Sequence, residues 1–381
     1  MKIAMIGWEY PPQYSGGLGI HCKAIVRELT GMGVLVDFYL PSLPNKIPIE
    51  IPERMTLYSV EIEHSNANLM HTYSGNMIWD TVNQFRQQLN VRFQPEGIDI
   101  IHAHDWMGVY SAFDIAQRYH IPLVWTVHST EYDRAAGKPS HPGILSIEEE
   151  AIAISDRTIA VSLRTQKILI EQYCAAPDKI EVIYNGIDTS PFEQLPHRDY
   201  HPNNGFVLYL GRVTGQKGPE LFLEAARLVL LTKKDTRFMI AGEGELLGKL
   251  RRRARRLKIN DRVEFIGAVV GDQVLECYRN AVIFILPAFS EPFGITVLEA
   301  MAAGLPTIIT TTTGAGEIVK FVEIVKPNDP NELAQKIISL LENPVLRQTL
   351  GQEGAKEVSQ YTWKRTADEI CSVYEKLLIK N

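Results

Sequence analysis

Short apolar runs alternate with amphipathic stretches along the whole chain. In the first half, six runs predict strands: Lys2–Ile6, Val34–Leu40, Asp99–Ala103, Leu123–Val127, Thr158–Val161 and Glu181–Tyr184. Helical patterns such as His21–Thr30 and Tyr110–Tyr119 lie between them. Apolar strands that alternate with helices are typical of a parallel sheet covered on both faces. Such sheets bind ligands beyond the carboxyl ends of their strands, so the residues just after each strand are the candidates for function.

The same alternation restarts at Phe206, after the polar, Pro-rich stretch Leu195–Gly205, which we interpret as a linker. The fold class predicted is therefore α/β, with two Rossmann-like parallel domains. We place the first domain at residues 1–195 and the second at 205–361, and a last amphipathic helix at 362–381.

The most informative stretch follows the apolar run Ala281–Leu286. Pro292 ends that strand, and the residues from 293 to 303 are good helix formers. Unpaired amides at a helix start favour an anion, and here they belong to Gly294, Ile295 and Thr296.

Two carboxylates, Glu291 and Glu299, bracket this anion site. A carboxylate repels a phosphate, so both are better suited to accept hydrogen bonds from sugar or ribose hydroxyls. The alternative is an ordinary strand–loop–helix unit with an acidic cap.

Other loops after predicted strands carry further candidates. Arg212 and Lys217 lie in a glycine-broken loop and together can neutralise a diphosphate. The glycine-rich loop around Gly17 opens a helix, which favours phosphate approach. That loop does not fit the dinucleotide pattern GxGxxG, because Cys22 stands where the third glycine would be, so an NAD enzyme is a weak alternative.

Two consecutive strands end in polar clusters that contain His102, His104 and Asp105, and then His128 and Glu131. Such histidines are often structural residues whose ring nitrogens are hydrogen-bonded within the protein. His102, His104, Asp105 and His128 are also candidate metal ligands, although nothing in the sequence fixes their mutual geometry. Beyond Glu131, we expect Asp133 and Arg134 to pair with each other.

The segment from Glu291 through Glu299 to Pro306, Glu-Pro-Phe-Gly-Ile-Thr-Val-Leu-Glu-Ala-Met-Ala-Ala-Gly-Leu-Pro, resembles the donor-binding signature of retaining glycosyltransferase family four. The glycine loop, His-Asp-Trp, Thr-Val-His, Asn-Gly-Ile-Asp and Gly-Arg-x-x-x-x-Lys-Gly segments resemble other motifs of that family. The resemblance implies the GT-B fold, two Rossmann-like domains facing across a cleft, with the last helix crossing back onto the first domain.

The resemblance also implies residue roles. The catalytic side chains would be Glu291, His128 and Asp105, and Glu131 would line the acceptor side. The donor would be bound by Gly17, Arg212, Lys217, Gly294, Ile295, Thr296, Glu299 and, through its backbone, Ala268. Tyr14 and Ile20 replace a lysine and an aspartate that the ADP-glucose-dependent synthases of the family usually have, which argues against their donor.

These roles imply a retaining, metal-independent hexosyltransferase without a cofactor. We expect UDP-glucose as the donor, ahead of GDP-mannose and ADP-glucose, and a saccharide or lipid-linked saccharide as the acceptor. The alternatives are a nucleotide-sugar epimerase of the same fold and an inactive nucleotide-sugar-binding protein.

Composition narrows the remaining classes. The net charge of -6 gives no reason to expect nucleic-acid binding. Four cysteines, Cys22, Cys174, Cys277 and Cys371, lie far apart and are typical of isolated thiols in a reducing compartment. No apolar run reaches the roughly 18 residues of a membrane span, and the first strand leaves no room for a signal peptide. We therefore expect a cytoplasmic protein, and peripheral contact with a membrane stays open.

Overall fold

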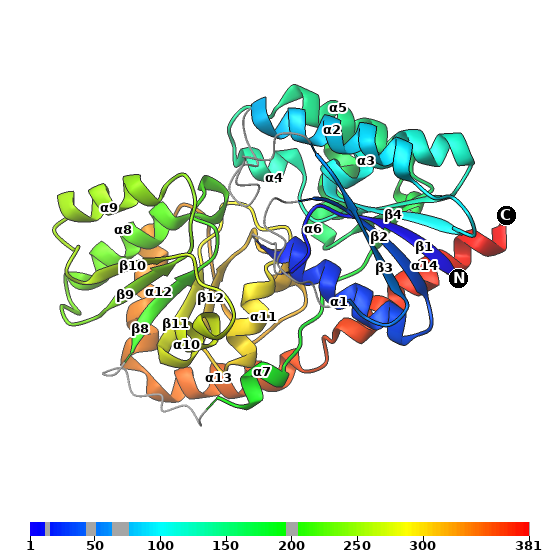
Figure 1. The fold of residues 1–381 in the computed structure, drawn as a ribbon. Coiled ribbons are helices and arrows are strands. Elements are labelled where there is room, and N and C mark those ends of the chain that lie inside the picture. The colour runs from blue at the N-terminus through cyan, green and yellow to red at the C-terminus, as the bar shows by residue number, and fades with distance from the viewer. Residues whose placement is uncertain (12–15, 43–50, 63–75, 196–204, 381) are drawn as a thin grey trace. The chain divides into compact units, whose positions relative to one another are not determined.

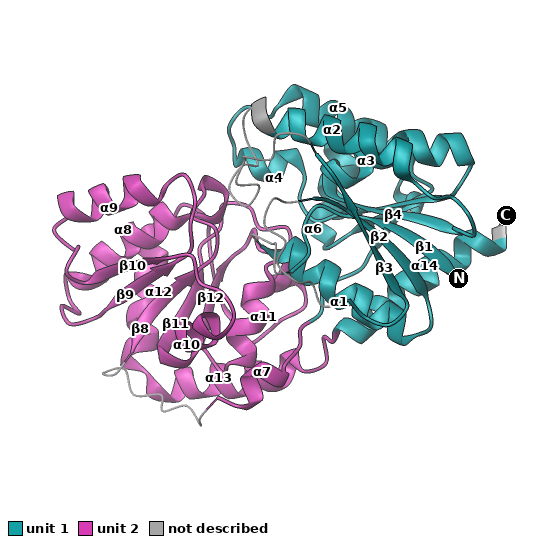
Figure 2. Ribbon diagram, viewed as in Figure 1, with its two compact units in different colours: residues 1–186, 363–381 teal, residues 187–362 magenta. Residues whose placement is uncertain are grey.

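The computed structural model describes residues 1–11, 16–42, 51–62, 76–195 and 205–380. They form two compact units, shown in Figure 2: unit 1 comprises residues 1–186 and 363–381, and unit 2 comprises residues 187–362. Each unit is built on one sheet whose paired strands are parallel. The predicted α/β class with two Rossmann-like domains is confirmed. Among the described residues, no helix combines the length and apolar character needed to cross a membrane.

The sheet of unit 1 has the strand order β3-β2-β1-β4-β5-β6-β7. Its strands are β1 (Lys2–Ile6), β2 (Leu35–Pro41), β3 (Met55–Val60), β4 (Ile100–His104), β5 (Leu123–Val127), β6 (Arg157–Ala160) and β7 (Ile180–Val182). Its helices are α1 (Gly17–Gly31), α2 (Asn76–Arg92), α3 (Asp105–Tyr119), α4 (Glu131–Ala135), α5 (Pro142–Ile154), α6 (Leu163–Tyr173) and α14 (Trp363–Lys380).

Helices cover both faces of this sheet, as its apolar strands require. Helices α2, α3 and α5 lie together on one face, and α1 packs against α14 on the other (Figure 1). Every residue of β4 and β5 is buried. The two histidines of β4 are therefore polar groups inside an apolar layer, which marks its carboxyl end as unusual.

The sheet of unit 2 has the order β10-β9-β8-β11-β12-β13. Its strands are β8 (Phe206–Leu210), β9 (Phe238–Ala241), β10 (Val263–Gly267), β11 (Ala281–Leu286), β12 (Thr307–Thr310) and β13 (Glu323–Val325). Its helices are α7 (Ser190–Glu193), α8 (Pro219–Leu230), α9 (Leu247–Arg256), α10 (Asp272–Asn280), α11 (Ile295–Ala302), α12 (Pro330–Glu342) and α13 (Pro344–Val358). Helix α8 packs against α12, and α11 packs against α13 (Figure 1).

The unit boundaries differ from the bounds expected from the sequence. Residues 187–195, which the apolar pattern assigns to the first domain, lie in unit 2 because α7 packs on α11 and the Phe192 ring contacts Tyr278. Helix α14 lies in unit 1, where the Thr366 hydroxyl donates to the Tyr184 carbonyl oxygen. Most of the expected linker, residues 196–204, lies outside the described residues.

Candidate active site

Strand order identifies the place for a ligand at the carboxyl ends of the strands of each sheet. In unit 1 the strands after β1 are added first on one side of it, as β2 and β3, and then on the other side, beginning with β4. In unit 2 the same switch of sides lies between β8 and β11. Open parallel sheets bind ligands beyond the carboxyl ends of the strands at such a switch point. The loops that follow β1, β4, β8 and β11 contain most of the candidate residues.

In unit 2, three loops approach one another backbone to backbone. Gly218 has φ 65°, and a Cβ there would lie 2.0 Å from the Pro287 carbonyl oxygen. Gly242 has φ 140°, and a Cβ there would lie 1.9 Å from the Gly211 carbonyl oxygen. Only glycine fits either position. The Gln216 carbonyl also accepts from the amides of Phe289, at 2.9 Å, and of Ser290. The loop after β8 is thereby fixed to the loop after β11.

This attachment brings Lys217 and Glu291 together. The Lys217 ammonium forms a short ion pair with the Glu291 carboxylate, and their side chains are 15% and 8% exposed. Glu291 is itself held by backbone contacts, since its amide donates to Thr312 and its carbonyl accepts from Gly314. The cation expected at a phosphate and the carboxylate expected at a sugar are therefore partners in this structure.

Arg212 begins the same loop and is partly buried. The Tyr209 hydroxyl donates to its carbonyl oxygen at 2.6 Å, which fixes the backbone there. Burial raises the pKa of Tyr209, and the nearby Glu291 carboxylate raises it further. Tyr209 therefore stays neutral, contacts the Arg212 backbone and lies near Glu291.

The start of α11 is an anion site by construction. Gly294 has φ 99° and precedes the first helical residue, and none of the side chains that the structure describes caps this helix. This conformation favours glycine, and a Cβ at Gly294 would lie 3.2 Å from Glu291 Cγ, a tight contact that would displace the Glu291 side chain slightly. The first amides of a helix have no intrahelical acceptor, so those of Ile295 and Thr296 suit a negatively charged group.

Glu299 lies one turn further along α11. Its Oε2 accepts a hydrogen bond from the Tyr278 hydroxyl at 2.8 Å. Burial raises the pKa of Glu299, and this hydrogen bond lowers it. Ala268, after β10, is exposed. The structure thus places Arg212, Lys217, Glu291, the α11 amides and Glu299 on loops and a helix that follow β8 and β11.

In unit 1, three histidines gather at the carboxyl ends of neighbouring strands. His104 ends β4, His128 follows β5, and His21 lies on α1 after β1. His104 Nδ1 lies 3.1 Å from His128 Nε2, and the His21 ring centroid lies 4.4 Å from that of His128. His102 is occupied elsewhere, because its ring nitrogens contact the Tyr374 and Thr126 hydroxyls at 2.5 and 2.7 Å.

Asp105 opens α3 in a left-handed conformation with φ 53°, which is strained for a residue other than glycine. Its Oδ1 accepts from the amides of His128 at 2.8 Å and Ser129 at 3.1 Å. Burial raises the pKa of Asp105 to about 7, against the opposing effect of Arg134 and these amides. Here the Asp105 carboxylate positions the His128 loop.

Glu131 belongs to a buried network. Its two carboxylate oxygens accept from the His141 amide at 2.8 Å and from Arg134 Nε at 3.2 Å. Arg134 also pairs with the fully buried Glu148. The expected pairing of Arg134 with Asp133 is wrong. Arg134 reaches two glutamates, while Asp133 pairs with Arg164 at 3.3 Å and accepts hydrogen bonds from Thr130.

Gly17 begins α1 and is exposed, with the extended Gly16 before it. Tyr14, one of the two residues that argue against an ADP-glucose donor, lies outside the described residues. Ile20, the other, is partly buried on α1. The structure therefore places the first amides of α1 at the unit 1 switch point.

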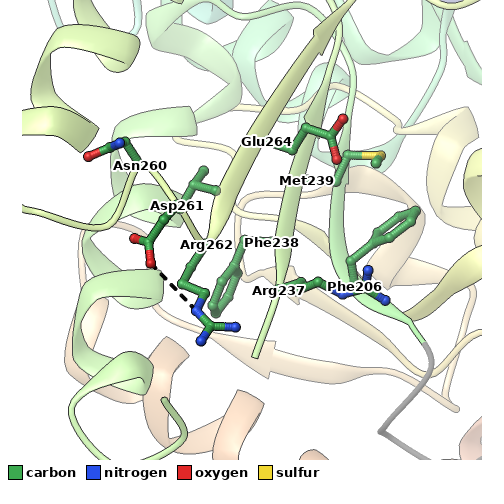
Figure 3. Close-up of a pocket in the computed structure, with 9 residues that line it drawn as sticks. Phe206, Arg237, Phe238, Met239, Asn260, Asp261, Arg262 and Glu264 are labelled. Atoms are coloured by element: carbon green, nitrogen blue, oxygen red, sulfur yellow. Dashed lines mark ion pairs between the residues drawn. The ribbon is translucent and has the colours of Figure 1, made fainter. Parts of the chain in front are cut away.

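A pocket of about 270 Å³ lies at the other end of the unit 2 strands, away from their carboxyl ends. Figure 3 shows its lining at the amino ends of β8, β9 and β10, with Phe206, Arg237 and Glu264 among the side chains. Arg262 is paired there with Asp261 at 3.7 Å. Since parallel sheets bind at the carboxyl ends of their strands, we do not assign the candidate site to this pocket.

Sequence reasoning missed the residues that support the candidates. Tyr278 holds Glu299, Asn185 holds His21 through a 2.7 Å contact between Oδ1 and Nδ1, and Gln216 joins two loops. His21 also had a signal, since it directly follows the Gly-rich loop after β1. Asn185 begins the Asn-Gly-Ile-Asp motif, but its contact with His21 had no local signal, and neither did the contacts of Tyr278 and Gln216, because each joins residues distant in sequence.

Comparison with known proteins gives two family models that match in tandem. The model described as Glycosyltransferase Family 4 matches residues 15–191, and the model described as Glycosyl transferases group 1 matches residues 196–357. An uncharacterized glycosyltransferase of Methanocaldococcus jannaschii is 30% identical over 98% of this chain and 98% of that protein. Glycogen synthase of Mycobacterium tuberculosis is 29% identical over 98% of this chain and 94% of its own.

Among solved structures, sucrose-phosphate synthase from Thermosynechococcus elongatus superposes with a TM-score of 0.83 at 21% identity, covering 100% of both chains. At this identity the likeness shows the fold alone. The chain therefore has the GT-B fold that the sequence motifs implied.

Proposed function

Because the chain belongs to the family 4 glycosyltransferases, we propose that it transfers a hexose from a nucleoside-diphosphate sugar to a saccharide acceptor, with retention of the anomeric configuration. UDP-glucose is the proposed donor. The acceptor is a growing polysaccharide or a lipid-linked saccharide. The proposal includes no metal and no cofactor, and it places the reaction in the cytoplasm.

The observation that carries this proposal is the charge arrangement after β8 and β11. Arg212, Lys217 and the first amides of α11 offer positive charge and donors for a diphosphate. Glu299, one turn into α11, offers a carboxylate oxygen for ribose hydroxyls. A ligand that carries both a diphosphate and a ribose fits these groups, and a free sugar would leave the cations unused.

We assign the chemical step to positioning and electrostatics. Lys217, Arg212 and the amides near Gly17, Gly294 and Ile295 stabilise the charge that develops on the departing diphosphate. Because two cations supply that charge, a divalent metal is not required. Lys217 is paired with Glu291 before the donor arrives, so the diphosphate takes over part of this contact.

Release from Lys217 leaves a carboxylate oxygen of Glu291 available for a hydroxyl of the transferred sugar. In unit 1, His128 is proposed to contact the same sugar, and Asp105 fixes the His128 loop through two backbone hydrogen bonds. Asp105 thus supports catalysis through His128 in addition to the sugar contact implied by family resemblance. The departing phosphate accepts the proton of the acceptor hydroxyl. Glu131 is proposed to line the acceptor side.

The choice of UDP-glucose as donor rests on one sequence position and on one similar protein. Ile20 stands where ADP-glucose-dependent synthases have an aspartate, which disfavours adenine nucleotides. The base is proposed to contact the backbone near Ala268, so side chains carry little information about its identity. The likeness to a glycogen synthase supports a glucose donor and a polysaccharide acceptor.

A thermal-shift screen with UDP, ADP, GDP and NADH tests the proposal. A ligand that binds only the folded protein at 100 times its Kd stabilises it by about 2.7 kcal/mol. We expect a shift with UDP, followed by glucose transfer from UDP-glucose to an added oligosaccharide. Conversion of the nucleotide sugar without an acceptor would favour the epimerase. Binding without either reaction would favour the inactive binder, and a shift with NADH alone would refute the donor class.

A further inference from the structure

Unit 1 contains a cluster of three imidazoles that the proposed reaction does not fully explain. His21, His104 and His128 each offer one ring nitrogen, and the three nitrogens lie within 4.8 Å of one another. Three points this close share a centre no more than about 2.8 Å from each (4.8 Å divided by √3). Zinc–imidazole bonds are about 2.0–2.1 Å long, so small ring rotations bring all three nitrogens to bonding distance.

The hydrogen bonds around His21 prepare it as a ligand. Its Nδ1 lies 2.7 Å from Asn185 Oδ1, which can only accept, so Nδ1 carries the proton and Nε2 carries the lone pair. That Nε2 is buried and has no hydrogen-bond partner in the described part of the chain. A metal-bound histidine usually donates its other nitrogen to an oxygen in this way, and a buried lone pair without a partner is costly.

The contact between His104 and His128 also has the spacing of a metal site. Their facing nitrogens, Nδ1 and Nε2, are 3.1 Å apart. Two nitrogens bound to one tetrahedral zinc ion lie about 3.4 Å apart, given the bond length above. An ion between them replaces this hydrogen bond, and the proton shared there moves to the outer nitrogen of the donor ring. Both imidazoles therefore stay neutral.

A carboxyl group lies beside two of the three imidazoles. Asp105 directly follows His104 in the chain, and its Oδ1 accepts from the His128 amide at 2.8 Å.

We propose that unit 1 binds one Zn²⁺ ion through His21, His104 and His128, with water in the fourth position, and that this ion inhibits the enzyme. The ion is not a cofactor of the reaction. Three imidazoles and an open position are typical of zinc and related late first-row ions, not of Mg²⁺. Inhibition follows because the bound ion engages His128, and this part rests on the proposed function, in which His128 contacts the transferred sugar.

The binding claim is tested with Co²⁺ as a coloured substitute for Zn²⁺, added to the full-length protein after metal removal. We expect one equivalent to give the strong visible absorption of a tetrahedral site, which one equivalent of Zn²⁺ then displaces. The variant His21→Gln should weaken binding at least about 100-fold, since losing only the hydrogen-bond partner of a metal ligand already costs 10- to 100-fold. The control His120→Gln removes an exposed imidazole on α3's C-terminal side and should bind as the wild type does.

A second variant, Asn185→Ala, keeps all three ligands and should weaken binding about 10- to 100-fold by freeing the His21 ring. It serves in place of His21→Gln if that variant does not fold. Absence of a tetrahedral spectrum in the wild type would overturn the proposal. Unchanged affinity in either variant would overturn it as well, because the ion would then lie elsewhere.

Activity separates this inference from the proposed function. We expect Zn²⁺ to inhibit transfer by the wild type and by His120→Gln, and EDTA to restore it. Stoichiometric Zn²⁺ binding in a protein without transferase activity would contradict only the proposed function. Transferase activity in a protein that does not bind Zn²⁺ would contradict only the metal site.

Discussion

Replacing Lys217 with methionine tests whether its pair with Glu291 is both structural and functional. Methionine keeps most of the apolar stem of lysine and removes the ammonium. The two side chains are 15% and 8% exposed, so Glu291 would be left as a buried charge without this partner. Breaking a buried ion pair by removing one partner costs about 3–5 kcal/mol, and the partial exposure of Lys217 points to the lower end.

The expected loss can be measured in two ways. A loss of about 3 kcal/mol in a unit of this size lowers Tm by roughly 6–12 °C. If Lys217 also binds the diphosphate, the variant loses a charge-assisted hydrogen bond of about 1.5–3 kcal/mol. The Kd for UDP, measured by calorimetry, should then rise about 10- to 150-fold.

The matched control is Lys336→Met. Lys336 pairs with Glu323 at 2.5 Å in the same unit, but these side chains are 39% and 20% exposed. An exposed pair contributes about 0–1 kcal/mol, so this variant should lose at most a few degrees in Tm and keep its affinity for UDP. If Lys217→Met behaves like the control in both measurements, the reasoning about the buried pair is refuted.

The reciprocal variant, Glu291→Ala, separates the two roles further. It should abolish transfer, because the proposed sugar contact is lost. It should bind UDP at least as tightly as the wild type does, because Lys217 no longer has to leave a carboxylate. Weaker binding of UDP would mean that Glu291 contacts the nucleotide itself.

Three further predictions concern other parts of the site. Tyr278→Phe removes the 2.8 Å hydrogen bond to Glu299 and should weaken UDP binding about tenfold, with fluorescence titration as the assay; unchanged affinity would exclude Glu299 from the ribose contact. The pKa of His21 is lowered to about 4, so its contribution to stability is complete above pH 6.5 and is lost as pH falls toward 4. Urea unfolding of His21→Gln should therefore show a stability slope between pH 6 and 5 that is smaller by up to about 1.4 kcal/mol than in the wild type. Asp105, whose pKa is raised, contributes with the opposite sign in both proteins and cancels in the comparison. Transfer should continue in EDTA, and activity restored by added Mg²⁺ would contradict metal independence.

The strands of unit 1 show what sequence patterns predict well. β1 and β5 have the predicted bounds, and β4 is displaced by one residue, because these strands are buried on both faces and read as continuous apolar runs. β3 was missed. It lies at the sheet edge next to β2 and is partly exposed, so its polar and apolar residues do not form such a run.

The sequence predicted which residues belong to the site, but it did not predict the contacts between them. Strand-end loops pointed to Arg212, Lys217 and Glu291, but the ion pair joins residues 74 positions apart and depends on how two glycine-broken loops meet. His21 and Asn185 are 164 positions apart. The first pair follows from the strand order, which places β8 beside β11. The second joins segments that follow β1 and β7, which are not neighbours in the sheet, and no local pattern encodes either pair.

The two clusters differ in charge, and the proposed donor has a charged and an uncharged part. In unit 2, Lys217 and Glu291 are charged and Arg212 adds a second cation, so this cluster suits the charged part of a ligand. In unit 1, burial keeps His104 and His128 neutral, so that cluster suits an uncharged, hydroxyl-rich part. A nucleoside-diphosphate sugar divides in the same way, with its charge on the diphosphate and none on the hexose. Neutral imidazoles near pH 7 are also what a zinc ion requires, so the property that suits His128 to a sugar exposes it to metal inhibition.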